Sequence, residues 1–205
     1  PSSLLRRGSL RSSAMPFASA NYPKDKTVVD PKRFFGLLPR GYPADFIAEY
    51  IAQTRTWFYY MHAMGVLLFH KRSFNTVVST GTVLAADGSK MSKSKGNYID
   101  PLVVMNQFGA DALRLHLMGS VVMAGEDLNF RDEDVREAHN RTIQMLWNCY
   151  NFFELYAHEY DGITPAGAST HVLDRWVLAR VHQTTIEMTE AFEVYNMPRA
   201  CKALR

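Results

Sequence analysis

Residues 44–79 of the chain read ADFIAEYIAQTRTWFYYMHAMGVLLFHKRSFNTVVS, and they contain the pattern that decides the fold. The first seven residues form a short apolar stretch that we interpret as a strand, and residues 54–69 have the length and composition of a helix. The β-branched run at residues 76–79 predicts a second strand, and extended structure resumes at residues 83–85 after Gly81. A strand, a helix and a strand at this spacing predict one βαβ crossover, and therefore a parallel sheet.

The composition is typical of a soluble globular protein. The chain has 205 residues, of which 47% are hydrophobic and 21% are charged, so it is not expected to be disordered. Its longest apolar run, residues 57–69, is shorter than the about 20 residues of a membrane-spanning helix. We interpret this run as a buried helix and expect no membrane partner. Cys149 and Cys201 form neither a disulfide framework nor a zinc motif. Reduced thiols favour a cytoplasmic protein, with an organellar location as the alternative.

The charge is distributed unevenly along the chain, although the formal net charge is only +3. Residues 1–40 carry eight Lys and Arg against two acids, a net of +6. Residues 121–162 carry three Arg against nine acids, a net of −6. This asymmetry excludes a uniformly basic surface for nucleic acid, so anion binding is expected to be local.

From Asp100 onward the pattern is helical. Asp100 and Pro101 predict the start of a helix that ends at Gly109, and Asp111 is expected to cap a second one. A third and longer helix is predicted to begin at Asp132. Apolar residues recur along it at three-to-four spacing and predict one buried face. They are Val135, Ile143, Leu146, Trp147, Tyr150, Phe153 and Leu155.

The rest of the chain completes an α/β part followed by an all-α part. Residues 161–171 have the composition of a linker, residues 173–194 predict an amphipathic helix, and residues 198–205 resemble the start of another. We therefore expect an α/β domain over residues 1–132 and a helical domain over residues 133–205.

The beginning of the chain is unusual. Residues 1–13, PSSLLRRGSLRSS, contain three Arg, no acid and no initiating Met. They suit a transit peptide, a disordered tail or a reading-frame artefact. Residues 16–43 are rich in Pro, Gly and aromatic residues and predict loop rather than regular structure. Both ends of the chain are abrupt, which suggests a fragment.

Residues 87–97, DGSKMSKSKGN, carry the most informative chemistry. Asp87 and Gly88 predict a turn after the preceding strand, and three lysines then alternate with hydroxyl groups over six residues. Lysine is a compact charge on a long stem that suits phosphate oxygens. A loop at the carboxyl end of a parallel strand also lies where α/β sheets bind ligands. We interpret the loop as a site that stabilises a polyphosphate, the alternative being a solvated basic turn. It is not a P-loop, because the GxxxxGK[ST] pattern is absent.

The run KMSKSKGN at residues 90–97 resembles the KMSKS signature of class I aminoacyl-tRNA synthetases. The resemblance continues over residues 14–205 and is closest to the isoleucine enzymes of this class, in the segments MPFASANYP, YPADFIAEYIAQTRTWFYYMHAMGVLLF, YIDPLVVMNQFGADALRLHLMGS and LDRWVLARVHQTT. It implies the C-terminal half of a Rossmann-like nucleotide-binding fold with a KMSKS loop. The start of a helical-bundle anticodon-binding domain would follow.

The resemblance also implies an activity and its participants. Such enzymes ligate isoleucine to tRNA(Ile) through an isoleucyl-adenylate made from ATP, with Mg²⁺ held mainly by phosphate oxygens and water. Lys93 is then the lysine most directly tied to ATP, and Lys90 joins it on the departing phosphates. Ser92 and Ser94 would donate hydrogen bonds or hold the loop, and Met91 would lie in the ATP site. No residue of the chain is assigned as a metal ligand.

Two further groups of residues match the resemblance. Glu49, Gln53 and Trp57 match positions that contact the aminoacyl-adenylate, where a carboxylate could hold the substrate ammonium group. Without the resemblance, Glu49 would be read as a surface acid at a strand end and Trp57 as a core residue. In the helical part, three arginines could reach tRNA phosphates, although pairing with neighbouring acids is the favoured alternative. They are Arg131, Arg136 and Arg141.

One departure limits what the chain is expected to do by itself. The HIGH motif, which belongs to the first half of the nucleotide-binding fold, is missing, and HKRS at His70 is no equivalent. We therefore expect the isolated chain to be inactive and to require the remainder of a full-length synthetase. The alternatives are a piece of a valine or leucine enzyme of the same class, and a non-catalytic tRNA-binding module derived from a synthetase.

Overall fold

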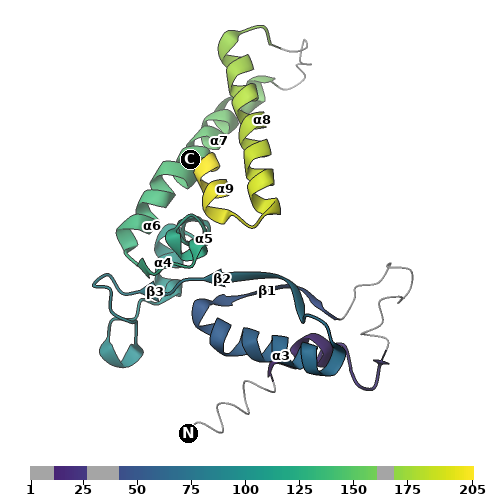
Figure 1. Ribbon diagram of the computed structural model, residues 1–205. Helices are drawn as coiled ribbons and strands as arrows, with labels where there is room; N and C mark the ends of the chain where they lie inside the picture. The colour runs from purple at the N-terminus through teal and green to yellow at the C-terminus, as the bar shows by residue number, and fades with distance from the viewer. Residues whose placement is uncertain (1–11, 27–41, 161–168) are drawn as a thin grey trace. The chain divides into compact units, whose positions relative to one another are not determined.

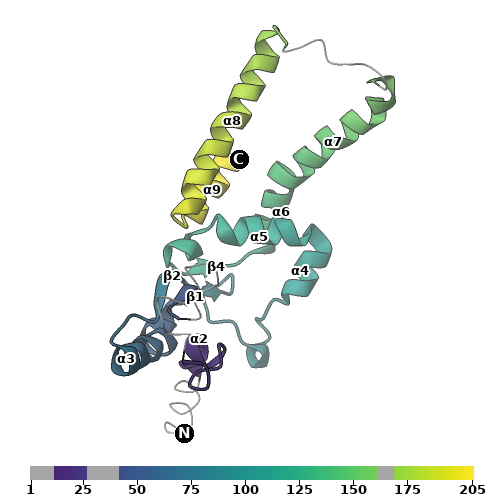
Figure 2. The same cartoon turned by 90° about the vertical axis from the view of Figure 1, so that its right-hand side faces the viewer.

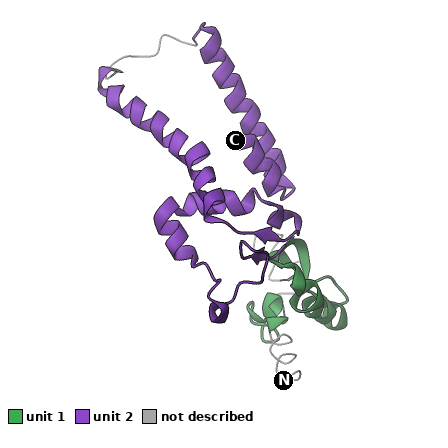
Figure 3. Ribbon diagram, turned by 90° about the vertical axis from the view of Figure 1, so that its left-hand side faces the viewer, with its two compact units in different colours: residues 1–80 green, residues 81–205 purple. Residues whose placement is uncertain are grey.

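The structure is a computed structural model that describes residues 12–26, 42–160 and 169–205. The chain divides into two compact units, residues 1–80 and residues 81–205 (Figure 3). This division differs in position from the domain boundary near Asp132, which stays a prediction. Most of the predicted N-terminal tail and most of the predicted linker lie outside the described residues. Among those that are described, no helix combines the length and apolar character needed to cross a membrane.

The first unit is built on the predicted βαβ crossover (Figure 1). Strand β1 (Ala44–Tyr50) leads through the 3-10 turn η3 (Ile51–Arg55) into helix α3 (Trp57–Phe69), and strand β2 (Phe74–Thr80) follows. The two strands pair in parallel, with six residue pairs in register from Ala44 to Tyr50. The crossover expected from the sequence is therefore confirmed.

Helix α3 buries one face rather than its whole surface, which corrects the expectation of a buried helix. Met61 is fully buried and packs with Phe58 and with Ile47 of β1. Leu67, on the same helix, is 74% exposed. The difference arises because the two-stranded sheet covers only one side of the helix among the described residues of this unit.

A short helix and an aromatic cluster occupy part of the region expected to be loop. Helix α2 (Met15–Ala18) begins with Pro16 in its first turn, where a missing N–H does no harm. Phe17 of α2 packs edge-on against Phe69, with ring centroids 5.3 Å apart, and against Tyr42 at 6.0 Å. The expectation of loop throughout residues 16–43 was thus wrong at α2, and residues 27–41 lie outside the described part of the chain.

The second unit begins with a small parallel pair and continues as helices. Strand β3 (Val83–Leu84) pairs in parallel with β4 (Leu128–Asn129). Between them lie η4 (Lys93–Lys95), α4 (Pro101–Phe108), α5 (Ala110–Met118) and η5 (Val121–Ala124). After β4 the described residues form α6 (Asp132–Ala138), the π-helical turn η6 (His139–Ile143), α7 (Gln144–Tyr156), η7 (Ala157–Tyr160), α8 (Val172–Glu193) and α9 (Met197–Leu204).

The helix starts follow local chemistry, with one correction. The Asp100 side chain accepts a hydrogen bond from the Leu102 N–H at 2.9 Å, so the predicted cap of α4 is confirmed. Asp111 does not cap α5 as expected, but lies in its first turn. A single residue, Gly109, separates the two helices, so Gly109 both ends α4 and caps α5. Its φ of 88° is one that glycine adopts readily.

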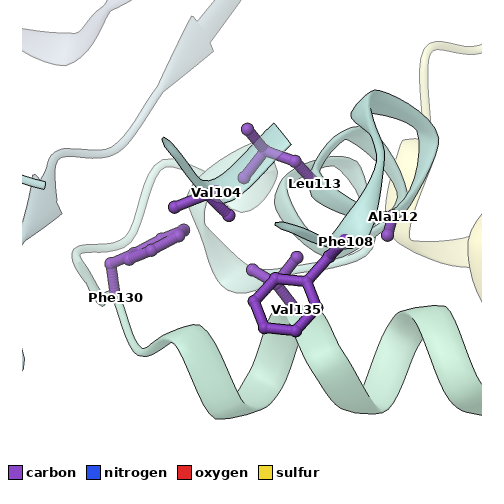
Figure 4. Close-up of a cluster of buried hydrophobic side chains, with 6 residues drawn as sticks. All are labelled: Val104, Phe108, Ala112, Leu113, Phe130 and Val135. Carbon is purple, nitrogen blue, oxygen red and sulfur yellow. The ribbon is translucent and has the colours of Figure 1, made fainter. Parts of the chain in front are cut away.

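The core of the second unit gathers apolar side chains from α4, α5, α6 and the segment after β4 (Figure 4). Val104 is 1% exposed and Val135 is fully buried. The other members of this core are Phe108, Ala112, Leu113 and Phe130. This cluster joins the β3–β4 pair to the first three helices of the unit.

The predicted long helix begins at Asp132 as expected, but its buried face ends early. Val135 is buried and Ile143 is half-buried, whereas Leu146 is 58% and Phe153 is 63% exposed. Trp147, Tyr150 and Leu155 are exposed too. Helix α9 lies beside α8 (Figure 1), while α7 and α8 run apart from each other (Figure 2). The apolar face of α7 therefore has no covering element within the described residues.

The one-sided packing of α3 predicts the effect of truncating its side chains. Met61→Ala should lower the free energy of unfolding by about 2–5 kcal/mol, because it leaves a cavity in a closed core. Leu67→Ala on the exposed face is the matched control and should change it by no more than about 0.5 kcal/mol. Urea denaturation followed by circular dichroism measures both. Equal losses in the two variants would contradict the described packing.

Burial of His116 predicts a pH dependence of stability. His116 is 9% exposed beside the ring of Phe130, and burial lowers its pKa in spite of the opposing effect of Asp134. A histidine in the unfolded chain titrates at about pH 6.5, so as the pH falls the unfolded chain binds the proton before the folded one does. Stability from this group is therefore present above about pH 6.5 and is lost as the pH falls toward the lower, folded pKa. The free energy of unfolding, measured from pH 8 down to pH 5, should decline less steeply in His116→Gln than in the unchanged chain.

Candidate active site

The lysine loop, defined as residues 85–97, connects β3 to α4 in the second unit. It opens with a tight turn in which the Gly88 N–H donates to the Ala85 carbonyl oxygen at 2.8 Å. The Asp87 carboxylate accepts the Ser89 N–H at 2.9 Å, and hydrogen bonds from Ser89 lower the pKa of Asp87. A backbone bridge between Leu84 and Lys90 then brings the chain back along β3. The turn predicted from Asp87 and Gly88 is confirmed.

A second turn, at residues 92–96, carries the other two lysines. Ser92 is extended, and its carbonyl oxygen accepts the Lys95 N–H at 3.2 Å. The hydroxyl oxygens of Ser92 and Ser94 lie 2.8 Å apart. Gly96 ends the turn in the left-handed conformation, with a φ of 70°. Among the described residues other than its chain neighbours, none has an atom within 4 Å of where a Cβ would be. The backbone conformation therefore explains this glycine rather than crowding.

The three lysines of the loop keep their charges available. Lys90, Lys93 and Lys95 are exposed, and none of them forms an ion pair with the described residues. The Lys93 ammonium group lies 5.2 Å from the centre of the Tyr98 ring, a cation–π contact. Three such charges within six residues repel one another, and an anion placed over the loop would relieve that repulsion.

Met91 anchors the middle of the loop to the core. Its side chain is half-buried and packs against the apolar cluster of the second unit. With Val83, Tyr98 and Ile99 it lines an apolar cavity of about 230 Å³. The neighbouring lysines are exposed. The lysine loop therefore places the Met91 side chain against the core and its lysine side chains in solvent. The expected place of Met91 in an ATP site stays a prediction.

Asn97 has a structural role in the loop that the sequence did not indicate. Its Oδ1 accepts the Ser92 N–H at 2.8 Å. Its Nδ2 donates to the Ser89 Oγ at 2.8 Å and to the Lys90 carbonyl oxygen at 3.3 Å. An Asn after a Gly is common in loops, but only the folded chain shows that its partners lie five to eight residues away.

The residues matched to an adenylate pocket lie in the first unit, at the carboxyl end of β1. Glu49 is exposed, lies opposite Ser79 in the parallel register, and accepts the Tyr50 N–H on its carboxylate at 3.3 Å. Carboxyl ends of parallel strands are the usual ligand edge of α/β sheets. Glu49 is therefore available to a ligand, and its role stays a prediction.

Gln53 and Trp57 have structural contacts of their own. The Gln53 Oε1 accepts the Trp57 N–H at 3.1 Å and also the Thr56 hydroxyl, so its carboxamide caps the start of α3. Trp57 is half-buried, contacts Phe58 at a centroid distance of 5.6 Å, and donates from Nε1 to the Ser12 carbonyl oxygen at 3.2 Å. These contacts hold both residues in place, and their contact with an adenylate stays a prediction.

The arginines considered for tRNA are partly engaged with the protein. Arg141 pairs with Glu137 one helical turn earlier at 2.9 Å, as the pairing alternative predicted. The Arg136 guanidinium lies 5.8 Å from the centre of the Phe108 ring. Arg131 is exposed and immediately precedes α6. Contact of these residues with tRNA stays a prediction. Within the described ranges, no group of His, Cys, Asp and Glu side chains could hold a metal ion.

Comparison with known proteins adds the family. Residues 10–131 match the sequence profile of the tRNA synthetases class I (I, L, M and V), which covers more than half of the chain. The chain belongs to the class I tRNA synthetase family. Among curated relatives of this synthetase chain, the isoleucine–tRNA ligase of Nocardia farcinica is 42% identical over 194 residues. That of Bdellovibrio bacteriovorus is 43% identical over 192 residues, and the cytoplasmic one of Schizosaccharomyces pombe is 39% identical over 194.

The synthetase chain is much shorter than these relatives. The alignments cover 91–95% of the chain but only 17–18% of the relatives. Among solved structures, the ternary complex of Agrobacterium radiobacter K84 LeuRS with tRNA and LeuAMS matches with a TM-score of 0.63. It is 22% identical in sequence, over 81% of this chain and 22% of that one. The likeness shows that the chain shares the α/β fold of a class I synthetase.

The left-handed turn of the lysine loop predicts the effect of substituting Gly96. Gly96→Ala should lower the free energy of unfolding by about 1–2 kcal/mol, because a Cβ disfavours positive φ. Gly96→Asn should lose less stability than Gly96→Ala, since Asn tolerates this conformation better than other residues with a side chain do. Urea denaturation, followed by the circular dichroism of the helices, measures the free energy of unfolding of both variants. A neutral Gly96→Ala would contradict the described turn.

Proposed function

We propose that the chain is the part of an isoleucyl-tRNA synthetase that contains its lysine loop and one side of its adenylate pocket. The enzyme would ligate isoleucine to tRNA(Ile), first forming isoleucyl-adenylate from ATP with release of pyrophosphate. The observation that carries this proposal is the lysine loop itself. It is a polar loop after a parallel strand, and its lysines form no ion pair with the described residues. About 40% identity to isoleucine–tRNA ligases supports the choice of amino acid.

The chemistry asked of the loop is electrostatic. When the isoleucine carboxylate attacks the α-phosphate, negative charge moves onto the departing pyrophosphate. Lys93 and Lys90 would stabilise that charge, and the hydroxyls of Ser92 and Ser94 would donate hydrogen bonds or hold the turn. Positioned charges of this kind act without a covalent enzyme intermediate.

The metal expected with ATP would be bound by the nucleotide more than by the chain. The loop offers ammonium groups, hydroxyls and amides, and Asp87 is its one carboxylate. Phosphate oxygens and water are suitable Mg²⁺ ligands, so the residues present fit a nucleotide-bound ion. We therefore propose Mg²⁺ as a companion of ATP, with no ligand assigned to the chain.

The adenylate pocket would use the carboxyl end of β1. Glu49 would attract the ammonium group of isoleucine, while Gln53 and Trp57 would line the pocket from the capped start of α3. The chain from Asp132 onward would begin the anticodon-binding helices. Arg131 is the candidate with the freest approach to tRNA phosphates, because Arg136 and Arg141 already contact Phe108 and Glu137.

Pyrophosphate exchange by the enzyme that contains this chain tests the proposal. Isoleucine should support the exchange and valine should support it less, by about 10- to 200-fold, because the two differ by one methylene group. Lys93→Ala should lower kcat by about 100-fold, since it removes a charge aimed at the developing anion.

The control is Lys202→Ala, which removes an exposed lysine of α9 and should leave the exchange unchanged. If the Lys93→Ala variant kept the unchanged rate of pyrophosphate exchange, the loop would not be the phosphate site. If leucine or valine were preferred to isoleucine, the enzyme would be another member of the class. If no amino acid supported exchange, a non-catalytic tRNA-binding module would be the better description.

A further inference from the structure

We propose that Asn97 is a positioning residue that holds the backbone of the lysine loop, and thereby the directions in which Lys90 and Lys93 leave it. The inference rests on the proposed function, since it concerns the same loop. Its observation is separate, because it comes from the hydrogen bonds beneath the loop rather than from the lysines. Asn97 is half-buried and follows the left-handed Gly96, which turns the chain back under the loop.

The Asn97 carboxamide is fully used by the loop. Its oxygen accepts from the Ser92 N–H at 2.8 Å, and its nitrogen donates to the Ser89 Oγ at 2.8 Å and to the Lys90 carbonyl oxygen at 3.3 Å. A carboxamide presents one acceptor and two donors in one plane, which suits this set of partners. Aspartate would keep the acceptor and lose both donors, and alanine would lose all three contacts.

These contacts fix the loop on both sides of Met91. The Lys90 carbonyl precedes Met91, the Ser92 N–H follows it, and the Met91 side chain enters the core between them. Ser92 is also the residue that starts the turn carrying Lys93. One side chain therefore sets the backbone beneath Lys90 and the start of the turn beneath Lys93.

The contacts also reach the first turn of the loop. The Ser89 hydroxyl accepts from Asn97, and its own hydrogen bond to Asp87 contributes to the lowered pKa of that carboxyl. Asn97, Ser89 and Asp87 thus link the two turns through side chains. Without this link, the mutual repulsion of three lysines would favour a more open loop.

The consequence for catalysis follows from geometry. Neither Lys90 nor Lys93 has an acidic partner among the described residues, and Lys93 contacts only the neighbouring ring of Tyr98. The backbone under the two lysines therefore largely determines where their ammonium groups can reach. A displacement of about 1 Å at reacting groups can lower a rate by about 100-fold. Loss of Asn97 should therefore reduce kcat, while the binding of isoleucine, which does not use this loop, should be kept.

The test measures pyrophosphate exchange in the enzyme that contains this chain, with the variants Asn97→Ala and Ser89→Ala. Asn97→Ala should lower kcat by about 100-fold with an unchanged KM for isoleucine. Ser89→Ala removes one of the three contacts, so it should lower kcat by less than Asn97→Ala does. Amide exchange at Ser92 should become faster in Asn97→Ala and stay slow in Ser89→Ala, because only the first variant frees the Ser92 N–H.

A double-mutant cycle separates positioning from a general effect on folding. In the Lys90→Ala, Lys93→Ala background, Asn97→Ala should cost little more, because its effect passes through those lysines. A full additional loss there, or an unchanged kcat in Asn97→Ala alone, would overturn the inference. If Asn97→Ala does not fold, Ser89→Ala, which removes one of the three contacts, replaces it in the same cycle and should likewise cost little more once both lysines are gone.

The two proposals fail differently. If Lys93→Ala has no effect on exchange, the proposed function of the loop fails and the inference fails with it. If Lys93→Ala lowers exchange and Asn97→Ala does not, the function stands and only the positioning role of Asn97 is rejected.

Discussion

The apolar core of the second unit is the constraint on which the lysine loop depends. The loop begins after β3, where Val83 packs against this core, and leads to α4, where Val104 belongs to it. Met91 adds a third attachment from the middle of the loop. Like charges in a short segment repel, so a loop with three lysines needs attachments that do not depend on charge. Burial of apolar side chains supplies them, and it leaves the ammonium groups in solvent.

The charges of the chain are used in two different ways. In the lysine loop, Asp87 attracts Lys95, but none of the lysines forms an ion pair within the described residues, so Lys90 and Lys93 are free to meet an anion. On α6 and the turn after it, Arg136 and Arg141 lie among acids, and Arg141 is paired with Glu137. A cavity of about 530 Å³ beside these helices mixes both signs, since Asp134, Glu137, Arg141 and Arg205 all line it. Net charge alone would not have separated these two environments.

The exposed apolar faces of α7 and α8 show where helical periodicity stops being informative. The spacing of Leu146, Trp147 and Tyr150 correctly indicates one apolar side of a helix, but all three are exposed. Trp176 and Ile186 on α8 are exposed as well. Periodicity states which side of a helix avoids water, and it does not state what covers that side. The chain spans less than a fifth of the length of its curated relatives.

The sequence by itself determined the local features of this protein. The cap at Asp100, the start of the long helix at Asp132 and the turn at Asp87 follow from interactions between residues a few positions apart. The parallel crossover follows from the order and lengths of its strands and helix. The tertiary structure decided the rest, including which face of α3 is buried and the three contacts of Asn97. The buried face of α3 depends on where β1 and β2 pack against the helix, and the contacts of Asn97 depend on how the whole loop folds back on itself. Neither is set by the residues next to it in the chain, because each needs several turns and elements to be in place at once.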